Sequence, residues 1–135
     1  EFGLVLRTDD GGETWQKLPP VSADFYPYDI LSVDENTAWV SGAAGQMRLT
    51  KDGGKTWEGK ESKAGAPLYR LFFHKGTPYG VGARGTVARL EGDVWQSVAY
   101  PDAIPVFLGS GASLEGSDNL LIGGPAGLLR SVPMK

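Results

Sequence analysis

The sequence predicts an all-β fold built from a repeated four-stranded unit, and three observations support this. A short acidic turn occurs twice, as RTDDGGETW at residues 7–15 and as LTKDGGKTW at residues 49–57. A glycine-rich turn recurs as GAAG, GARG and GPAG, ending at Gly45, Gly85 and Gly127. The chain of 135 residues contains 20 glycines and 9 prolines, which is typical of many short strands joined by turns.

Each repeat of about 40 to 42 residues divides into four short segments of strand-forming residues separated by turns. In the first complete repeat these segments are YDILSVD, TAWVSGA, QMRLTK and TWEGK. The next repeat copies the order with LYRLFFH, TPYGVGA, TVARLE and VWQSVA. Glycine supplies the positive backbone dihedral angles that such tight turns require. Four strands in a unit of this length are typical of a β-propeller blade.

The chain is therefore expected to be a partial β-propeller of antiparallel blades. Residues 1–18 correspond to the end of a blade, residues 22–61 and 67–100 to two whole blades, and residues 105–135 to an incomplete blade. Propellers usually close with about four to eight blades. We therefore expect a fragment of a larger ring, or a chain that associates with itself or with a second fragment, because open blades expose apolar faces and strand edges.

Composition narrows the functional classes. A formal net charge of -3 argues against a general nucleic-acid binder, which needs a basic face toward the phosphates. The absence of cysteine excludes disulfides and thiolate zinc sites. No apolar run approaches the roughly 18 residues of a membrane-spanning helix. Neither a metal nor another cofactor is expected.

The two acidic turns follow the pattern Ser/Thr-x-Asp-x-Gly-x-Thr-Trp. A short carboxylate in a turn accepts hydrogen bonds from nearby backbone amides, and a tryptophan covers the turn with a large apolar face. The alternative, a calcium loop, needs a run of oxygen ligands that neither turn has. We therefore expect a structural role for the matched residues, which are Thr8, Asp10, Gly12, Thr14, Trp15, Thr50, Asp52, Gly54, Thr56 and Trp57.

This pattern resembles the Asp-box, or bacterial neuraminidase repeat, which occurs in sialidases, sortilin-like receptors and exported assembly factors. The stretch AWVSGAAGQMRLTKDGGKTW at residues 38–57, with IGGPAGLLRS at residues 122–131, resembles the repeat of the photosystem II stability/assembly factor family. The resemblance implies a non-enzymatic, chaperone-like factor that binds a partner protein, and a membrane-protein complex is one such partner. It also implies export to a periplasm or a thylakoid lumen.

The same resemblance implies an arginine-bearing partner surface. Four arginines recur 41 residues apart, namely Arg7, Arg48, Arg89 and Arg130. Arginine suits such a surface because its planar fork pairs with carboxylates and covers apolar groups. Arg48 lies one place earlier than the family pattern requires, and a one-place shift along a strand moves a side chain to the other face. The alternative is a solvated strand residue paired with a neighbour such as Asp9 or Glu91.

The alternative function is a carbohydrate-binding or sialidase-like glycoside hydrolase propeller. Such an enzyme needs a tyrosine nucleophile and an acid, for which Tyr26, Tyr28, Tyr69, Tyr79, Tyr100 and Glu61 are available. None lies in a recognisable catalytic context, so no catalytic residue is predicted. The single histidine, His74, has no serine or cysteine nearby in sequence and is expected to be a strand-end residue. The aromatic segment ADFYPYD, at residues 23–29, fits either a binding patch or packing between blades.

Overall fold

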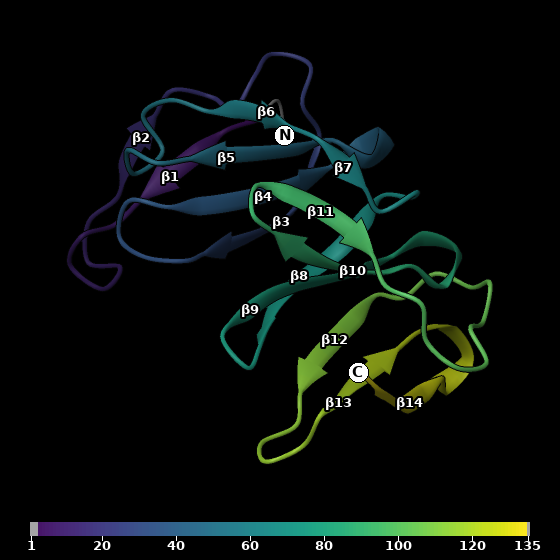
Figure 1. The fold of residues 1–135 in the computed structure, drawn as a ribbon. Coiled ribbons are helices and arrows are strands. Elements are labelled where there is room, and N and C mark those ends of the chain that lie inside the picture. Colours follow the sequence, from purple (N-terminus) through teal and green to yellow (C-terminus); the bar gives the residue numbers. More distant parts are fainter. Residues whose placement is uncertain (1–2, 135) are drawn as a thin grey trace.

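The computed structural model describes residues 3–134 as four β-sheets that follow one another along the chain (Figure 1). Residues 1, 2 and 135 lie outside the described part. They belong to the first and last of the predicted blade segments. The first sheet contains β1 (Val5–Arg7) and β2 (Gln16–Leu18), and the second contains β3 (Pro27–Ser32), β4 (Ala38–Gly42), β5 (Met47–Thr50) and β6 (Glu58–Lys60). The third contains β7 (Ser62–Lys63), β8 (Leu68–His74), β9 (Thr77–Gly82), β10 (Val87–Glu91) and β11 (Val94–Ser97), and the fourth contains β12 (Ser110–Ser113), β13 (Asn119–Gly123) and β14 (Leu129–Pro133).

The sheets are arranged as blades of a partial β-propeller, as the sequence predicts. The first strands of successive sheets lie next to one another, with β3 beside β8 and β8 beside β12. From these inner strands the later strands of each sheet follow outward in chain order, as in β3-β4-β5-β6, except that β7 lies at the outer edge of the third sheet. The fold is therefore all-β, with sheets packed face to face around their inner strands (Figure 1).

Short turns hold these strands in register. The three glycine-rich turns are the 3-10 segments η1 (Ala43–Gly45), η2 (Ala83–Gly85) and η3 (Pro125–Gly127), and in each the middle residue has a positive φ between 54° and 56°. The terminal glycines have φ values from 71° to 75°, a region that residues with a side chain rarely adopt. Across η1 the amide of Gly42 donates to the carbonyl of Gln46 over 2.9 Å, which joins the end of β4 to the residue before β5.

The third sheet differs from the predicted four-stranded unit. Residues of β7, which lie in the link between the predicted blades, pair parallel with β11, so that Trp95 stands opposite Ser62. The link runs along the outer edge of the sheet before the chain enters β8. A two-residue strand has no detectable alternation, so the pattern of the sequence contains no signal for it.

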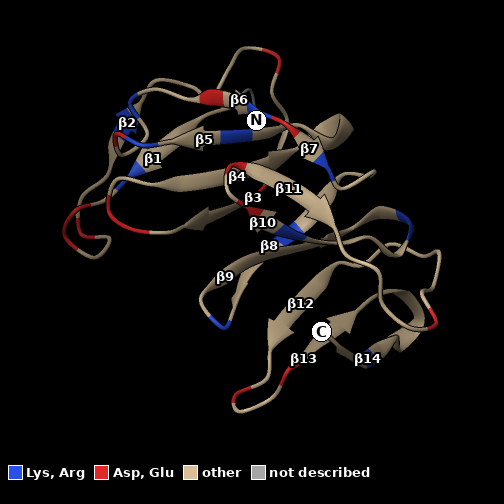
Figure 2. Cartoon of the chain, viewed as in Figure 1, with Lys and Arg blue, Asp and Glu red and all other residues tan. Residues whose placement is uncertain are grey.

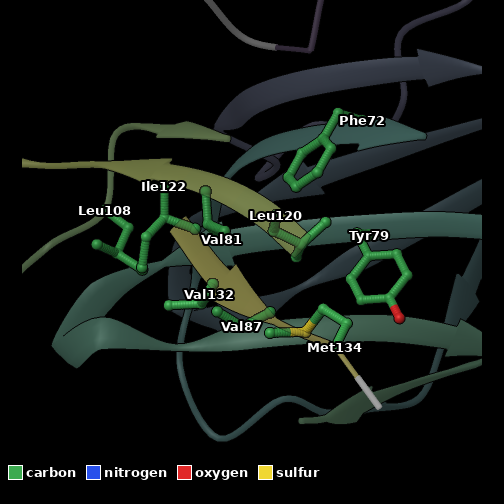
Figure 3. Close-up of a cluster of buried hydrophobic side chains, with 9 residues drawn as sticks. All are labelled: Phe72, Tyr79, Val81, Val87, Leu108, Leu120, Ile122, Val132 and Met134. Carbon is green, nitrogen blue, oxygen red and sulfur yellow. The ribbon is translucent and has the colours of Figure 1, made fainter. Parts of the chain in front are cut away.

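Apolar side chains fill the spaces between neighbouring sheets. Between the second and third sheets, Trp39 and Trp95 meet edge to face with their ring centroids 5.7 Å apart. The third and fourth sheets enclose the cluster in Figure 3, which comprises Phe72, Tyr79, Val81, Val87, Leu108, Leu120, Ile122, Val132 and Met134. Alternate strand residues point to opposite faces, so each central sheet supplies side chains to two such clusters.

The space between the first and second sheets has a smaller buried cluster. It consists of Val21, Phe25 and Val40, with Val5 and Trp57 packed partly against it. Several large apolar residues nearby stay exposed, including Leu6 at 52% and Ile30 at 55%. The only helices among residues 3–134 are the three-residue 3-10 segments, and none is long and apolar enough to cross a membrane.

Candidate functional site

The acidic turn at residues 8–15 is closed by its own side chains. Oδ1 of Asp10 accepts hydrogen bonds from the Thr14 amide at 2.9 Å and from the Thr8 hydroxyl at 2.7 Å, while Oδ2 accepts from the Thr14 hydroxyl at 2.5 Å. The amide of Gly12 donates to the Thr8 hydroxyl over 2.8 Å. These bonds favour the ionised carboxylate and lower the pKa of Asp10 to about 2, with the Thr14 hydroxyl as the largest cause.

The turn at residues 50–57 repeats this arrangement. Asp52 accepts from the Thr56 amide at 2.9 Å, from the Thr56 hydroxyl at 2.5 Å and from the Thr50 hydroxyl at 2.9 Å. Its pKa is likewise lowered to about 2, chiefly by the Thr56 hydroxyl. In both turns the carboxylate thus accepts hydrogen bonds from groups of its own turn.

The tryptophans that end the two turns have different surroundings. Trp15 is 59% exposed, and its indole Nε1 donates to the Gly12 carbonyl over 3.1 Å. Trp57 is half-buried against the cluster between the first and second sheets. The second turn is covered because the first sheet lies against it, whereas the described chain has no sheet against the first turn.

Two arginines of the series bond with neighbouring groups. Arg7 donates from Nε to Asp9 at 2.7 Å and from Nη1 to the carbonyls of Glu35 at 3.0 Å and Gly53 at 3.2 Å. Arg89 pairs with Glu91 at 2.6 Å, and hydrogen bonds to Glu91 and Tyr79 raise the pKa of its guanidinium. Both arginines form the ion pair that is expected of a solvated strand residue. Arg7 in addition connects the first sheet to the second through its bonds to Glu35 and Gly53.

The other two arginines contact the protein differently. Arg48 lies over the Phe25 ring, with the guanidinium carbon 5.7 Å from the centroid, and its Nε is buried without a hydrogen-bond partner among the described residues. Arg130 donates to the carbonyl of Asp102 over 2.7 Å. All four arginines are partly buried, and basic segments are spread over several sheets (Figure 2).

Strand register divides the four arginines into two pairs. Arg48 stands opposite Val40 and Arg130 opposite Ile122, whereas Arg89 stands opposite Tyr79. Counted from the turn glycines, Arg48 and Arg130 are three residues after Gly45 and Gly127, while Arg7 and Arg89 are four residues after Gly3 and Gly85. Neighbouring strand positions face opposite sides of a sheet. The structure therefore does not place the four arginines on one face, and counting from the glycines would have revealed this in the sequence.

The residues considered for hydrolysis are dispersed. Tyr79 is buried, Tyr100 donates to the Gly85 carbonyl over 2.7 Å, and Glu61 lies 3.6 Å from Lys63. Tyr28 packs edge to face with Tyr26 and Tyr69, at centroid distances of 6.0 and 5.2 Å. The segment at residues 23–29 thus both packs across the sheets and keeps Tyr26 exposed at 60%.

His74 has a partner that sequence reasoning missed. Its Nδ1 lies 2.8 Å from the hydroxyl of Ser113, which belongs to β12 of the next sheet. The two residues are 39 positions apart, and only the packing of β8 against β12 brings them together. The buried ring also packs edge to face against Tyr79. Within residues 3–134, no three His, Cys, Asp or Glu side chains gather in a way that could hold a metal ion.

Comparison with known proteins supports the fold. No protein-family model and no curated protein matches the chain. The solved structure of YCF48 bound to D1 peptide is similar, with a TM-score of 0.58 and 20% identity over 95% of this chain. The match covers 43% of that structure's chain, so the present chain spans less than half its length. At this identity the likeness concerns the fold alone.

Proposed function

We propose that this chain is part of a non-catalytic β-propeller scaffold that binds a protein partner, in the manner of an assembly or stability factor. The observation that carries the proposal is the likeness in fold to YCF48, whose solved structure holds a D1 peptide. Fold likeness by itself is weak support for function, so the proposal needs a test at the level of residues. A membrane-protein complex as the partner, and export to a periplasm or thylakoid lumen, belong to the same proposal.

We also propose that the two acidic turns are Asp-boxes with a structural role. Their support is that both turns have the same carboxylate, hydroxyl and amide bonds at nearly the same distances, 42 residues apart. The carboxylates of Asp10 and Asp52 bond with both the backbone and the side chain of the threonine four residues later, which fixes the shape of each turn.

Within the arginine series, we propose that Arg48 and Arg130 contact the partner. They occupy the same register position in their sheets, and neither forms an ion pair within the described chain. Arg7 and Arg89, by contrast, are each engaged by a carboxylate. A guanidinium without a carboxylate partner can still receive one from a bound peptide, which is the pairing that arginine provides best.

Calorimetric titration with the D1 peptide tests this proposal. We expect binding that weakens at least tenfold in the double variant Arg48→Glu and Arg130→Glu, because two attractive contacts become repulsive. The double variant Lys17→Glu and Lys55→Glu is the matched control, since both lysines are exposed, lie outside the series and form no ion pair among the described residues. Unchanged affinity in the double variant would contradict the assignment of these arginines. Absence of any binding would exclude D1-type peptides as the partner, and competition by a soluble sialoside would favour the carbohydrate alternative.

A further inference from the structure

The strands of the first sheet correspond to the outer two strands of the second sheet. Val5, Leu6 and Arg7 pair with Leu18, Lys17 and Gln16. Met47, Arg48 and Leu49 pair with Lys60, Gly59 and Glu58 in the same way, 42 residues later. Hence β1 is the counterpart of β5, and β2 is the counterpart of β6.

The two counterparts differ at their other edge. In the second sheet β5 also pairs with β4, which places Trp39 opposite Leu49 and Val40 opposite Arg48. In the first sheet no strand among residues 3–134 pairs with the second edge of β1. An unpaired edge presents a row of backbone donors and acceptors, which readily accepts another strand.

The apolar face beside this edge shows the same difference. Ile30 of β3 stands opposite Val40, and Leu71 of β8 stands opposite Gly80, at the equivalent place in the next sheet. Leu71 is 3% exposed because it lies in the cluster that contains Trp39, whereas Ile30 is 55% exposed. Trp39 of the neighbouring sheet covers Leu71, whereas no counterpart of Trp39 covers Ile30 among the described residues.

A hollow of about 350 Å³ lies at this place. Its lining is mainly apolar and includes Leu4, Val5, Leu6, Ile30, Val40 and Trp57. Leu4 and Leu6 are exposed at 53% and 52%. The repeat itself indicates the occupant, because the equivalent space between the second and third sheets is filled by Trp39 of β4, with Leu31 of β3 packed against the same cluster.

We propose that this hollow binds a β-hairpin of a further repeat of the same kind, with the chemistry of residues 27–42. Its second strand adds antiparallel to the free edge of β1, with the counterpart of Trp39 opposite Arg7 and the counterpart of Val40 opposite Leu6. The hairpin enters the chain at Gly3, because Gly3 has a φ of 68°, close to the 75° of Gly45 at the end of the equivalent turn. The inference rests on the repeat and not on the proposed partner of the arginines.

A fusion protein tests this proposal. A second copy of residues 22–44 replaces residues 1 and 2 and is joined directly to Gly3. The junction then reproduces the natural step from Ala44 to Gly45. Hydrogen exchange is then followed at the amides of Val5, Leu6 and Arg7. We expect exchange at those amides that point away from β2 to slow at least tenfold relative to the unfused chain, because the added strand supplies acceptors and excludes water.

A matched pair of substitutions in the original copy makes the test specific. Ile30→Lys should remove the added protection, because the charge would be buried under the added tryptophan. Val33→Lys should retain it, since Val33 is also exposed, at 43%, but does not line the hollow. Neither substitution buries a new charge in the unfused chain, so both variants are expected to fold.

Three results would overturn the proposal. The first is exchange in β1 as fast with the added hairpin as without it, and the second is equal protection in the Ile30→Lys fusion. The third concerns the unfused chain. If it sediments as a dimer in which the β1 amides are already protected, a second copy and not a further repeat occupies the hollow.

Discussion

Nη1 of Arg7 donates a hydrogen bond to the carbonyl of Gly53 over 3.2 Å, so a strand of the first sheet holds the acidic turn of the second. The same nitrogen donates to the carbonyl of Glu35 over 3.0 Å. One side chain thereby connects β1 with two separate loops of its neighbour. Arg7 thus joins two sheets that share only a small apolar cluster, and its removal should have local consequences.

Arg7→Ala should loosen the first sheet without unfolding the remainder. Hydrogen bonds from a charged donor contribute about 1.5–3 kcal/mol when buried, and exposed ion pairs about 0–1 kcal/mol. Because the side chain is 30% exposed, we expect a loss of about 1 kcal/mol, measured by hydrogen exchange in β1 and β2. Lys17→Ala, at an exposed site of β2, is the control. Uniform destabilisation of all four sheets would contradict a local role.

Gly53→Ala should destabilise the protein more than Gly11→Ala. The two glycines occupy equivalent places in the two turns and have the same φ of 73°, so alanine meets the same backbone strain of about 1–2 kcal/mol at both. A methyl group at Gly53 would in addition overlap Nη1 of Arg7, whereas one at Gly11 meets nothing within 4 Å. Urea unfolding should show the larger loss for Gly53→Ala. The excess should disappear when Arg7 is also replaced by alanine, and its persistence would show that Arg7 is not the cause.

Acid should weaken the two turns within a defined range of pH. The pKa values of Asp10 and Asp52 are lowered from 3.8 to about 2 by the threonine hydroxyls and amides. A lowered pKa in the folded state adds stability that is complete above the unfolded value and is lost as the pH falls toward 2. Urea midpoints measured between pH 5 and pH 2 should therefore fall. The double variant Asp10→Asn and Asp52→Asn should show a shallower dependence, and a dependence equal to that of the parent would contradict the assignment.

Trp39→Ala should cost about 3–5 kcal/mol of unfolding free energy, the usual range for removing a buried large aromatic side chain. Trp39 is 2% exposed and meets Trp95 of the next sheet edge to face. Trp15→Ala is the matched control, because Trp15 is 59% exposed and its nitrogen donates a hydrogen bond within its own turn. Thermal and urea unfolding should separate the two variants clearly. Similar losses would mean that the buried side chain of Trp39 contributes less to the free energy of unfolding than its burial implies.

Much of the local structure was predictable because it depends on neighbouring residues. The segment predicted from LYRLFFH is β8, Leu68–His74, and the following Lys75 and Gly76 form a two-residue turn with positive φ values of 49° and 77°. The four-stranded repeat followed from the spacing of turn residues, whose backbone requirements are local. The parallel strand β7 was not predictable, because two residues have no periodicity and take their structure from the edge of β11.

The sequence by itself determined the strands, the turns and the repeat, since each depends on side chains a few positions apart. Tertiary structure decided which side chains meet between sheets. It placed Arg7 beside Gly53 and His74 beside Ser113. It also left Ile30 exposed where Leu71 is buried. The physical reason is that a shift of one position along a strand reverses the face of a side chain, while contacts between sheets join residues that no local pattern connects.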